Sequence, residues 1–269
     1  MPIITISRGS YSKGKAVAEK VAQKLGYECI SRDIILEASE EFNVPEIKLI
    51  RAIHDAHGIL DRLSHEKDKY IAYVQTALLK HFRKDNIVYH GLGGHFFVKG
   101  ISHVLKVRII ADLEERVRLE VEREGIFRSE ALHLLKKDDE ERRKWSQYLY
   151  GTDTWNPSLY DLVLHIHKVS VDDAADIICH TAELQDFQAT PESKKAMEDL
   201  VLAARVKAVL IALDHGIKIS AQDGIVFVRS EATLQQESSL SHDIEKISKQ
   251  ISGVKDVRID VEPIVPFSE

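Results

Sequence analysis

Over residues 1–185, short apolar runs alternate with segments of helical periodicity. A strand that returns in the same direction needs a crossover, usually a helix, so this alternation predicts an α/β fold. We expect a five-stranded parallel sheet with helices on both faces. The runs of strand length lie at 3–6, 29–30, 87–89, 104–110 and 162–166.

The interval between the second and third runs, roughly 33–84, has helical periodicity. Asn43-Val44-Pro45 and Gly58 interrupt it, and such residues commonly mark turns, so we expect a helical insert of at least three helices. Two further helices are predicted between the fourth and fifth runs, the second from about Ser129 to Tyr150.

The pattern changes after residue 185. Residues 186–198 are mostly polar and include Pro191, which predicts a linker. Residues 199–269 then have apolar faces of their own, so we expect a second, small α+β domain beside a first domain over 1–185. Its predicted elements are a helix near 200–210, strands at 217–219 and 225–228, a helix near 244–251 and a strand at 257–261.

The first strand run leads into a loop of small and polar residues. Gly9 and Gly14-Lys15 have the spacing G-x-x-x-x-G-K of a phosphate-binding loop. Glycines let backbone N–H groups surround a phosphate, the following helix adds its positive end, and the lysine supplies a mobile charge. The alternative is a glycine-rich strand–helix turn of another doubly wound protein. The candidate nucleotide-binding residues are Gly9, Ser10, Tyr11, Ser12, Lys13, Gly14, Lys15 and Ala16.

Composition narrows the class of protein. The formal net charge of −6 and the pI of about 6.1 argue against a general nucleic-acid-binding protein, which carries a basic face. Cys29 and Cys179 have apolar neighbours and no metal-type spacing, so we expect reduced thiols. No leader and no transmembrane segment is recognised, which predicts a cytoplasmic protein.

Every residue from Lys136 to Lys144 is charged. One interpretation is a solvated helix face, because the acidic residues at 138–140 stand four positions before the basic residues at 142–144 and can pair with them. The other is a lid that brings arginines onto transferring phosphates, since guanidinium groups bind phosphate bidentately. Arg142 and Arg143 are the candidate catalytic residues of such a lid, together with Lys15.

Three further residues are candidates for the same site. His90 follows the third strand run, where an aspartate that helps to hold magnesium is expected. Arg51 and Arg62, on the helical insert, have the chemistry to bind a monophosphate, although surface arginines are common. Packing is the alternative role for His90.

Four parts of the chain match segments of a known family. They are Ile6-Ser7-Arg8 with Gly14-Lys15, then Ile30–Ile35, Asp139 with Arg142, and Pro157–Val163. With these segments the chain resembles the cytidylate-kinase-like family over 1–185. This resemblance implies a P-loop kinase core with a lid, ATP with Mg²⁺ as phosphoryl donor, and a nucleoside monophosphate such as CMP as acceptor. It also implies that Arg32 and Asp33 border the acceptor.

The chain departs from the family's pattern where magnesium is organised. Ala16 and Val17 supply no hydroxyl after Lys15, and His90 replaces an aspartate. Leu92 stands where the family usually has an arginine. We therefore expect slow phosphoryl transfer and leave the metal ligands unassigned. The alternative is a non-catalytic nucleotide sensor.

The C-terminal region is similar to the BON domain at Ala203–Lys207 and Ser252–Val257. The resemblance implies an interaction module that binds a surface or a protein partner. A homodimer is left open.

Overall fold

The computed structural model describes residues 2–9, 12–31, 33–54, 66–91, 93–233 and 235–263. Four of the expected site residues, Ser10, Tyr11, Arg32 and Arg62, lie outside these ranges.

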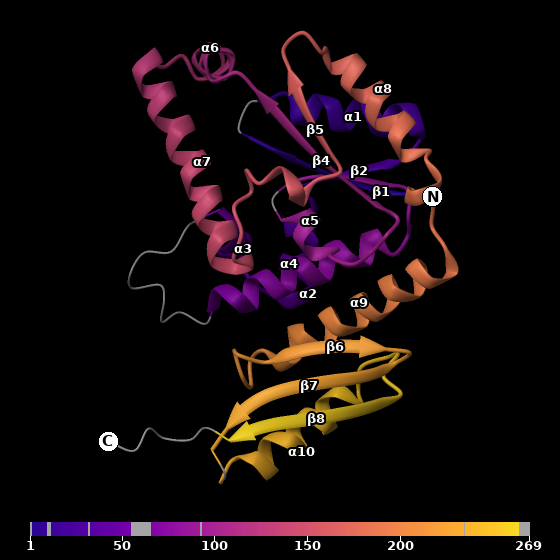
Figure 1. Ribbon diagram of the computed structural model, residues 1–269. Helices are drawn as coiled ribbons and strands as arrows, with labels where there is room; N and C mark the ends of the chain where they lie inside the picture. The colour runs from indigo at the N-terminus through magenta and orange to yellow at the C-terminus, as the bar shows by residue number, and fades with distance from the viewer. Residues whose placement is uncertain are drawn as a thin grey trace.

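A five-stranded parallel sheet forms the centre of the larger part of the molecule (Figure 1). Its order is β2-β3-β1-β4-β5, so β1 is the central strand. The five strands fall where the apolar runs predicted them, and the α/β expectation is confirmed. The strands are β1 (Ile3–Arg8), β2 (Glu28–Ile30), β3 (Ile87–His90), β4 (Val104–Ala111) and β5 (Leu162–Ile166).

Helices cover both faces of this sheet. On one face, α1 (Gly14–Leu25) and α8 (Val171–Ala182) pack their small and β-branched residues against β1 and β4. Ile3, Ile4 and Ile6 of β1 are almost fully buried, as expected for a central parallel strand covered on both sides.

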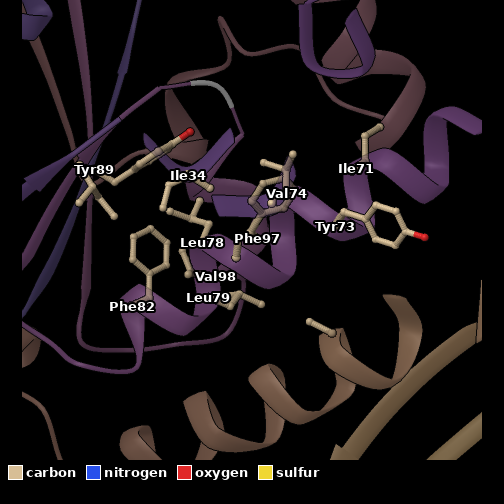
Figure 2. Close-up of a cluster of buried hydrophobic side chains, with 14 of the residues drawn as sticks. Ile34, Ile71, Tyr73, Val74, Leu78, Leu79, Phe82, Tyr89, Phe97 and Val98 are labelled. Carbon is tan, nitrogen blue, oxygen red and sulfur yellow. The ribbon is translucent and has the colours of Figure 1, made fainter. Parts of the chain in front are cut away.

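The helical insert covers the opposite face. It consists of α2 (Asp33–Phe42), α3 (Glu46–His54) and α4 (Glu66–Phe82), and α5 (Gly94–Phe97) follows β3. Figure 2 shows the core that α4 forms with its neighbours, and these side chains make one continuous apolar cluster. The labelled members are Ile34, Ile71, Tyr73, Val74, Leu78, Leu79, Phe82, Tyr89, Phe97 and Val98.

Two helices connect β4 to β5 at the edge of the molecule. α6 (Leu113–Glu124) and α7 (Arg128–Tyr150) pack together through Val117, Ala131 and Leu135. Trp145 of α7 donates a 3.1 Å hydrogen bond from its indole nitrogen to the carbonyl of Ala52, so α7 is also held against the insert. A 3-10 turn, η2 (Pro157–Leu159), precedes β5.

A single helix joins the two parts of the chain. α9 (Pro191–Leu210) lies between the five-stranded sheet and a second sheet in Figure 1. One of its faces packs with α4 in the core of Figure 2 through Met197, Val201, Ala204 and Ala208. Another face, with Leu202, Val206 and Leu210, belongs to the core of the second sheet.

The interval 186–198, which polar composition predicted to be a linker, is largely helical in the structure. It contains the end of η3 (Gln185–Phe187) and the first two turns of α9, which Thr190 caps with a reciprocal Thr190–Ser193 pair. Pro191 occupies the first helical turn, where its missing N–H costs nothing. The division into domains at 185 and 199 stays a prediction.

The second sheet has the order β6-β7-β8, with β6 antiparallel and β8 parallel to β7. Asp223 and Gly224 both have positive φ, as the tight turn between β6 and β7 requires. The small α+β unit expected beyond 199 is confirmed. Its elements after α9 are β6 (Lys218–Gln222), β7 (Ile225–Ala232), α10 (Glu237–Ser248) and β8 (Asp256–Pro263).

Within the part of the chain that the structure describes, no helix combines the length and the apolar character needed to cross a membrane.

Candidate functional site

The described residues of the loop from β1 to α1 lead directly into the start of a helix. Ser12 is buried, and its hydroxyl donates a 3.0 Å hydrogen bond to the carbonyl of Gly9. The backbone of Lys13 has the left-handed conformation, with φ of 62°, and α1 begins at the next residue. The first N–H groups of a helix have no partner within the helix, so they are available to a phosphate.

A close contact requires glycine at position 14 of the motif, whereas position 9 has more room. A Cβ on Gly14 would lie 2.7 Å from the Cβ of Arg8, so only glycine fits beneath the loop. A Cβ on Gly9 would lie 3.5 Å from the guanidinium carbon of Arg116. Arg116 of α6 is therefore placed beside the loop.

The two lysines of the loop pair with carboxylates. Lys15 is exposed, and its Nζ lies 3.6 Å from Oε1 of Glu19, one helical turn further along α1. Lys13 lies 3.2 Å from the Glu115 carboxylate of α6. A phosphate at the helix start would therefore compete with Glu19 for the Lys15 ammonium group.

Helix α7 brings Arg142 to the loop. Its Nη1 donates a 2.8 Å hydrogen bond to the carbonyl of Arg8, the last residue of β1. Burial lowers the pKa of Arg142, and the positive charge of Arg8 lowers it further. Arg116 and Asp139 form a bidentate ion pair, with both N–O distances 2.9 Å, which ties α6 to α7 beside this contact.

Arg143 is placed differently. Its Nε and Nη2 donate to Asp153 at 2.9 and 2.7 Å, and its guanidinium lies over the Trp155 ring at 4.7 Å. Hydrogen bonding to Arg143 lowers the pKa of Asp153. The structure thus brings Arg142 to the phosphate loop and holds Arg143 at the segment that follows α7.

His90 ends β3 on the α1 side of the sheet. Burial lowers its pKa to about 4, and the charge of Arg8 contributes in the same direction. The imidazole is therefore neutral at pH 7. Its Nδ1 is buried and has no hydrogen-bond partner among the described residues.

The residues present do not fit a protein-held magnesium ion. Mg²⁺ prefers oxygen ligands in octahedral geometry, whereas Ala16 and Val17 carry no side-chain oxygen and His90 offers a nitrogen. The described residues contain no group of three or more His, Cys, Asp or Glu side chains that could hold a metal.

Of the residues expected at the acceptor, two are described. Asp33 is the first residue of α2, and its negative charge slightly opposes the lowering of the pKa of His90. Arg51 is exposed on α3.

Sequence reasoning missed three residues near the loop: Arg116, Arg108 and Tyr160. Arg116 sits in a helix rich in charged residues, where nothing distinguishes it. Arg108 could have been singled out from the sequence, because it is a charged residue within the apolar run of β4. Tyr160 lies in the Pro157–Val163 segment, but its role depends on contacts with β1 and β4.

The parallel sheet and the loop after its central strand define a P-loop kinase core. The model of the cytidylate kinase-like family matches residues 3–168, and the chain belongs to this family.

Similar proteins cover the same part of the chain. A cytidylate kinase of Archaeoglobus fulgidus is 30% identical over 192 residues, which are 69% of this chain and 97% of the relative. A cytidylate kinase of Sulfolobus acidocaldarius is 27% identical over 65% of this chain and 91% of its own length. The fold also matches an uncharacterized protein from Eubacterium ventriosum, with a TM-score of 0.54, 21% identity, and coverage of 68% of this chain and 98% of that one.

Proposed function

We propose that the chain transfers a phosphoryl group from ATP to a nucleoside monophosphate, with CMP as the acceptor to test first. Membership of the cytidylate kinase-like family and relatives named cytidylate kinase support the reaction class. The observation that supports the proposal best is the hydrogen bond from Arg142 of α7 to the carbonyl of Arg8, the last residue of β1 before the loop.

The proposed roles follow from this placement. Backbone N–H groups from Gly9 to Ala16 bind the phosphates of ATP, and Lys15 leaves Glu19 to bind them as well. Arg142 stabilises the charge that develops on the transferring group. Arg32, Asp33, Arg51 and Arg62 are proposed to border the acceptor.

Magnesium, in this proposal, accompanies the nucleotide. Bound to ATP, it neutralises phosphate charge, whereas the described residues offer it no hydroxyl or carboxylate at Ala16, Val17 and His90. We therefore expect ATP affinity to depend little on magnesium and turnover to be slow for the class.

A nucleotide sensor is the second candidate. The same three residues favour it, because they remove metal-organising groups without disturbing the loop. The shared helix α9 favours it too, since its side chains belong to the core of α4 and to the core of the second sheet. The C-terminal region, with its BON-like segments, would then be the interaction module.

A coupled assay with ATP, Mg²⁺ and a panel of nucleoside monophosphates tests the proposal. We expect slow turnover with CMP, increased by Ala16→Thr because the new hydroxyl can reach the metal. Lys15→Ala should raise the Kd for ATP about tenfold or more, as for loss of a charge-assisted contact, whereas the matched surface variant Lys20→Ala should not. ATP binding without turnover of any acceptor would exclude the kinase and leave the sensor.

A further inference from the structure

Arg108 is a buried arginine in an apolar strand. It lies in the second half of β4, and its neighbours Val107 and Ile109 are fully buried on the opposite face of the sheet. Only 9% of Arg108 is exposed. Its guanidinium therefore lies inside the protein, next to β1.

Among the described residues, the groups in hydrogen-bond contact with Arg108 are uncharged. Its Nη1 lies 3.4 Å from the hydroxyl of Ser7 and 3.3 Å from that of Tyr160. The guanidinium also faces the Tyr160 ring, with 5.6 Å to the centroid. The Tyr160 hydroxyl donates in turn to the carbonyl of Thr154 at 2.9 Å.

The charged and titratable groups that the structure describes around Arg108 do not compensate its positive charge. His95, 3.5 Å from the Tyr160 hydroxyl, is neutral, since burial and the charge of Arg108 lower its pKa to about 3. Lys106 acts on His95 in the same direction. Asp153 is near enough for Arg108 to lower its pKa slightly, but it is paired with Arg143. Among the described residues, no carboxylate forms an ion pair with Arg108.

A buried cation without a carboxylate destabilises a fold, because desolvation is not offset by an opposite charge. An anion bound nearby would supply that charge. Ser7 stands two residues before Gly9, and a strand rises about 3.3 Å per residue, so the guanidinium lies roughly 10 Å from the start of the phosphate loop. At this distance, through protein rather than water, a positive charge attracts a phosphate appreciably.

We propose that Arg108 is an affinity-determining residue for phosphate-bearing nucleotides, acting electrostatically from beneath the loop rather than by contact. The inference rests on the proposed function only in locating the phosphates at Gly9–Ala16. The charge of Arg108 then strengthens the binding of anionic ligands and lowers the stability of the ligand-free protein. Functional sites often combine a gain in activity with such a loss of stability.

The test compares Arg108→Met with the wild-type chain, measuring the affinity for ATP, pyrophosphate and uncharged adenosine by calorimetry. We expect the Kd for ATP and pyrophosphate to rise about tenfold, in line with the Coulomb energy of one charge at this distance. Adenosine affinity should stay unchanged, and the Tm of the ligand-free protein should stay the same or rise. A lower Tm with unchanged ATP affinity would overturn the proposal and make Arg108 a structural residue.

If Arg108→Met does not fold, two further variants, whose side chains are similar in length to arginine, provide the test. Arg108→Lys keeps the charge and should hold the ATP Kd within about threefold, whereas Arg108→Gln should lose about tenfold. Equal affinities in these two variants would overturn the proposal. ATP binding that depends on Arg108, without turnover, would refute the kinase and leave this inference standing; a wild-type chain that binds neither ATP nor pyrophosphate would refute both.

Discussion

Two adjacent arginines of α7 show that a difference of one position in a helix changes which groups a side chain contacts. Arg142 and Arg143 are consecutive, but successive side chains on a helix point about 100° apart. Arg142 therefore reaches the carbonyl of Arg8, while Arg143 reaches Asp153 and Trp155. The two side chains are chemically identical, but their directions on the helix give them different surroundings and, in our proposal, different roles.

Arg142→Ala should reduce kcat for phosphoryl transfer by a factor of about 10² or more, the size of effect found when a group that stabilises transition-state charge is removed. ATP affinity should change less than about threefold. Arg143→Ala is the matched control on the same helix turn, and steady-state kinetics with ATP and CMP provide the comparison. A larger loss of kcat in Arg143→Ala would reverse the assignment.

His90 should make the free energy of unfolding depend on pH. Its folded-state pKa of about 4 lies below the ordinary value of 6.5, so the unfolded chain binds a proton that the folded chain refuses. Stability is then lost as pH falls through 6.5 toward 4, by about 2 kcal/mol between pH 7 and pH 5.

Urea unfolding of the wild-type chain and of His90→Gln at both pH values measures this contribution. We expect the variant to lose less stability on acidification. Equal losses in the two proteins would show that the imidazole is not held neutral by burial.

At the scale of elements, α9 is the helix whose side chains belong both to the core of the helical insert and to the core of the second sheet. Thr76 of α4 donates from its hydroxyl to the carbonyl of Ala204 at 3.1 Å, so the contact between the two helices includes backbone as well as apolar side chains. Lys194 pairs with the largely buried Asp85, and Arg83 pairs with Glu198. The Arg83–Glu198 pair is exposed on both sides and contributes little. The buried face of α9 is what joins the second sheet to the helical insert.

Met197→Ala should destabilise the chain by about 2–4 kcal/mol, because Met197 is 2% exposed in the core that α4 shares with β1 and β3. Glu198→Ala, one residue along on the exposed side, should cost less than about 1 kcal/mol. The free energies of urea unfolding provide the comparison. Similar small effects for both variants would mean that α9 belongs energetically to the second sheet alone.

For the whole molecule, the shared helix predicts one cooperative unit in place of two independent domains. Scanning calorimetry of the full chain should give a single unfolding transition, and ATP should move all of it to higher temperature, since a ligand stabilises everything that unfolds together. Two transitions, with ATP moving only one, would restore the boundary predicted near residues 185–199.

Much of this architecture could be predicted because it depends on local pattern. Strand-length apolar runs located all five parallel strands, and the spacing of Gly9, Gly14 and Lys15 predicted the change from strand to loop to helix at that place. Hydrophobic periodicity also predicted the elements of the second sheet, since each needs only one apolar face. At 186–198 polar composition did not predict the helix, because capping residues and exposed helical turns are as polar as a linker.

The sequence by itself determined the strands, the loop and the missing metal-binding side chains at Ala16, Val17 and His90, because these depend on residue type and on near neighbours in the chain. Tertiary structure alone decided which arginines lie beside the loop or near it. Arg108, Arg116 and Arg142 come from β4, α6 and α7, about a hundred residues or more beyond β1. No short-range pattern encodes such meetings, because parallel crossovers and helix packing bring distant segments to one edge of the sheet.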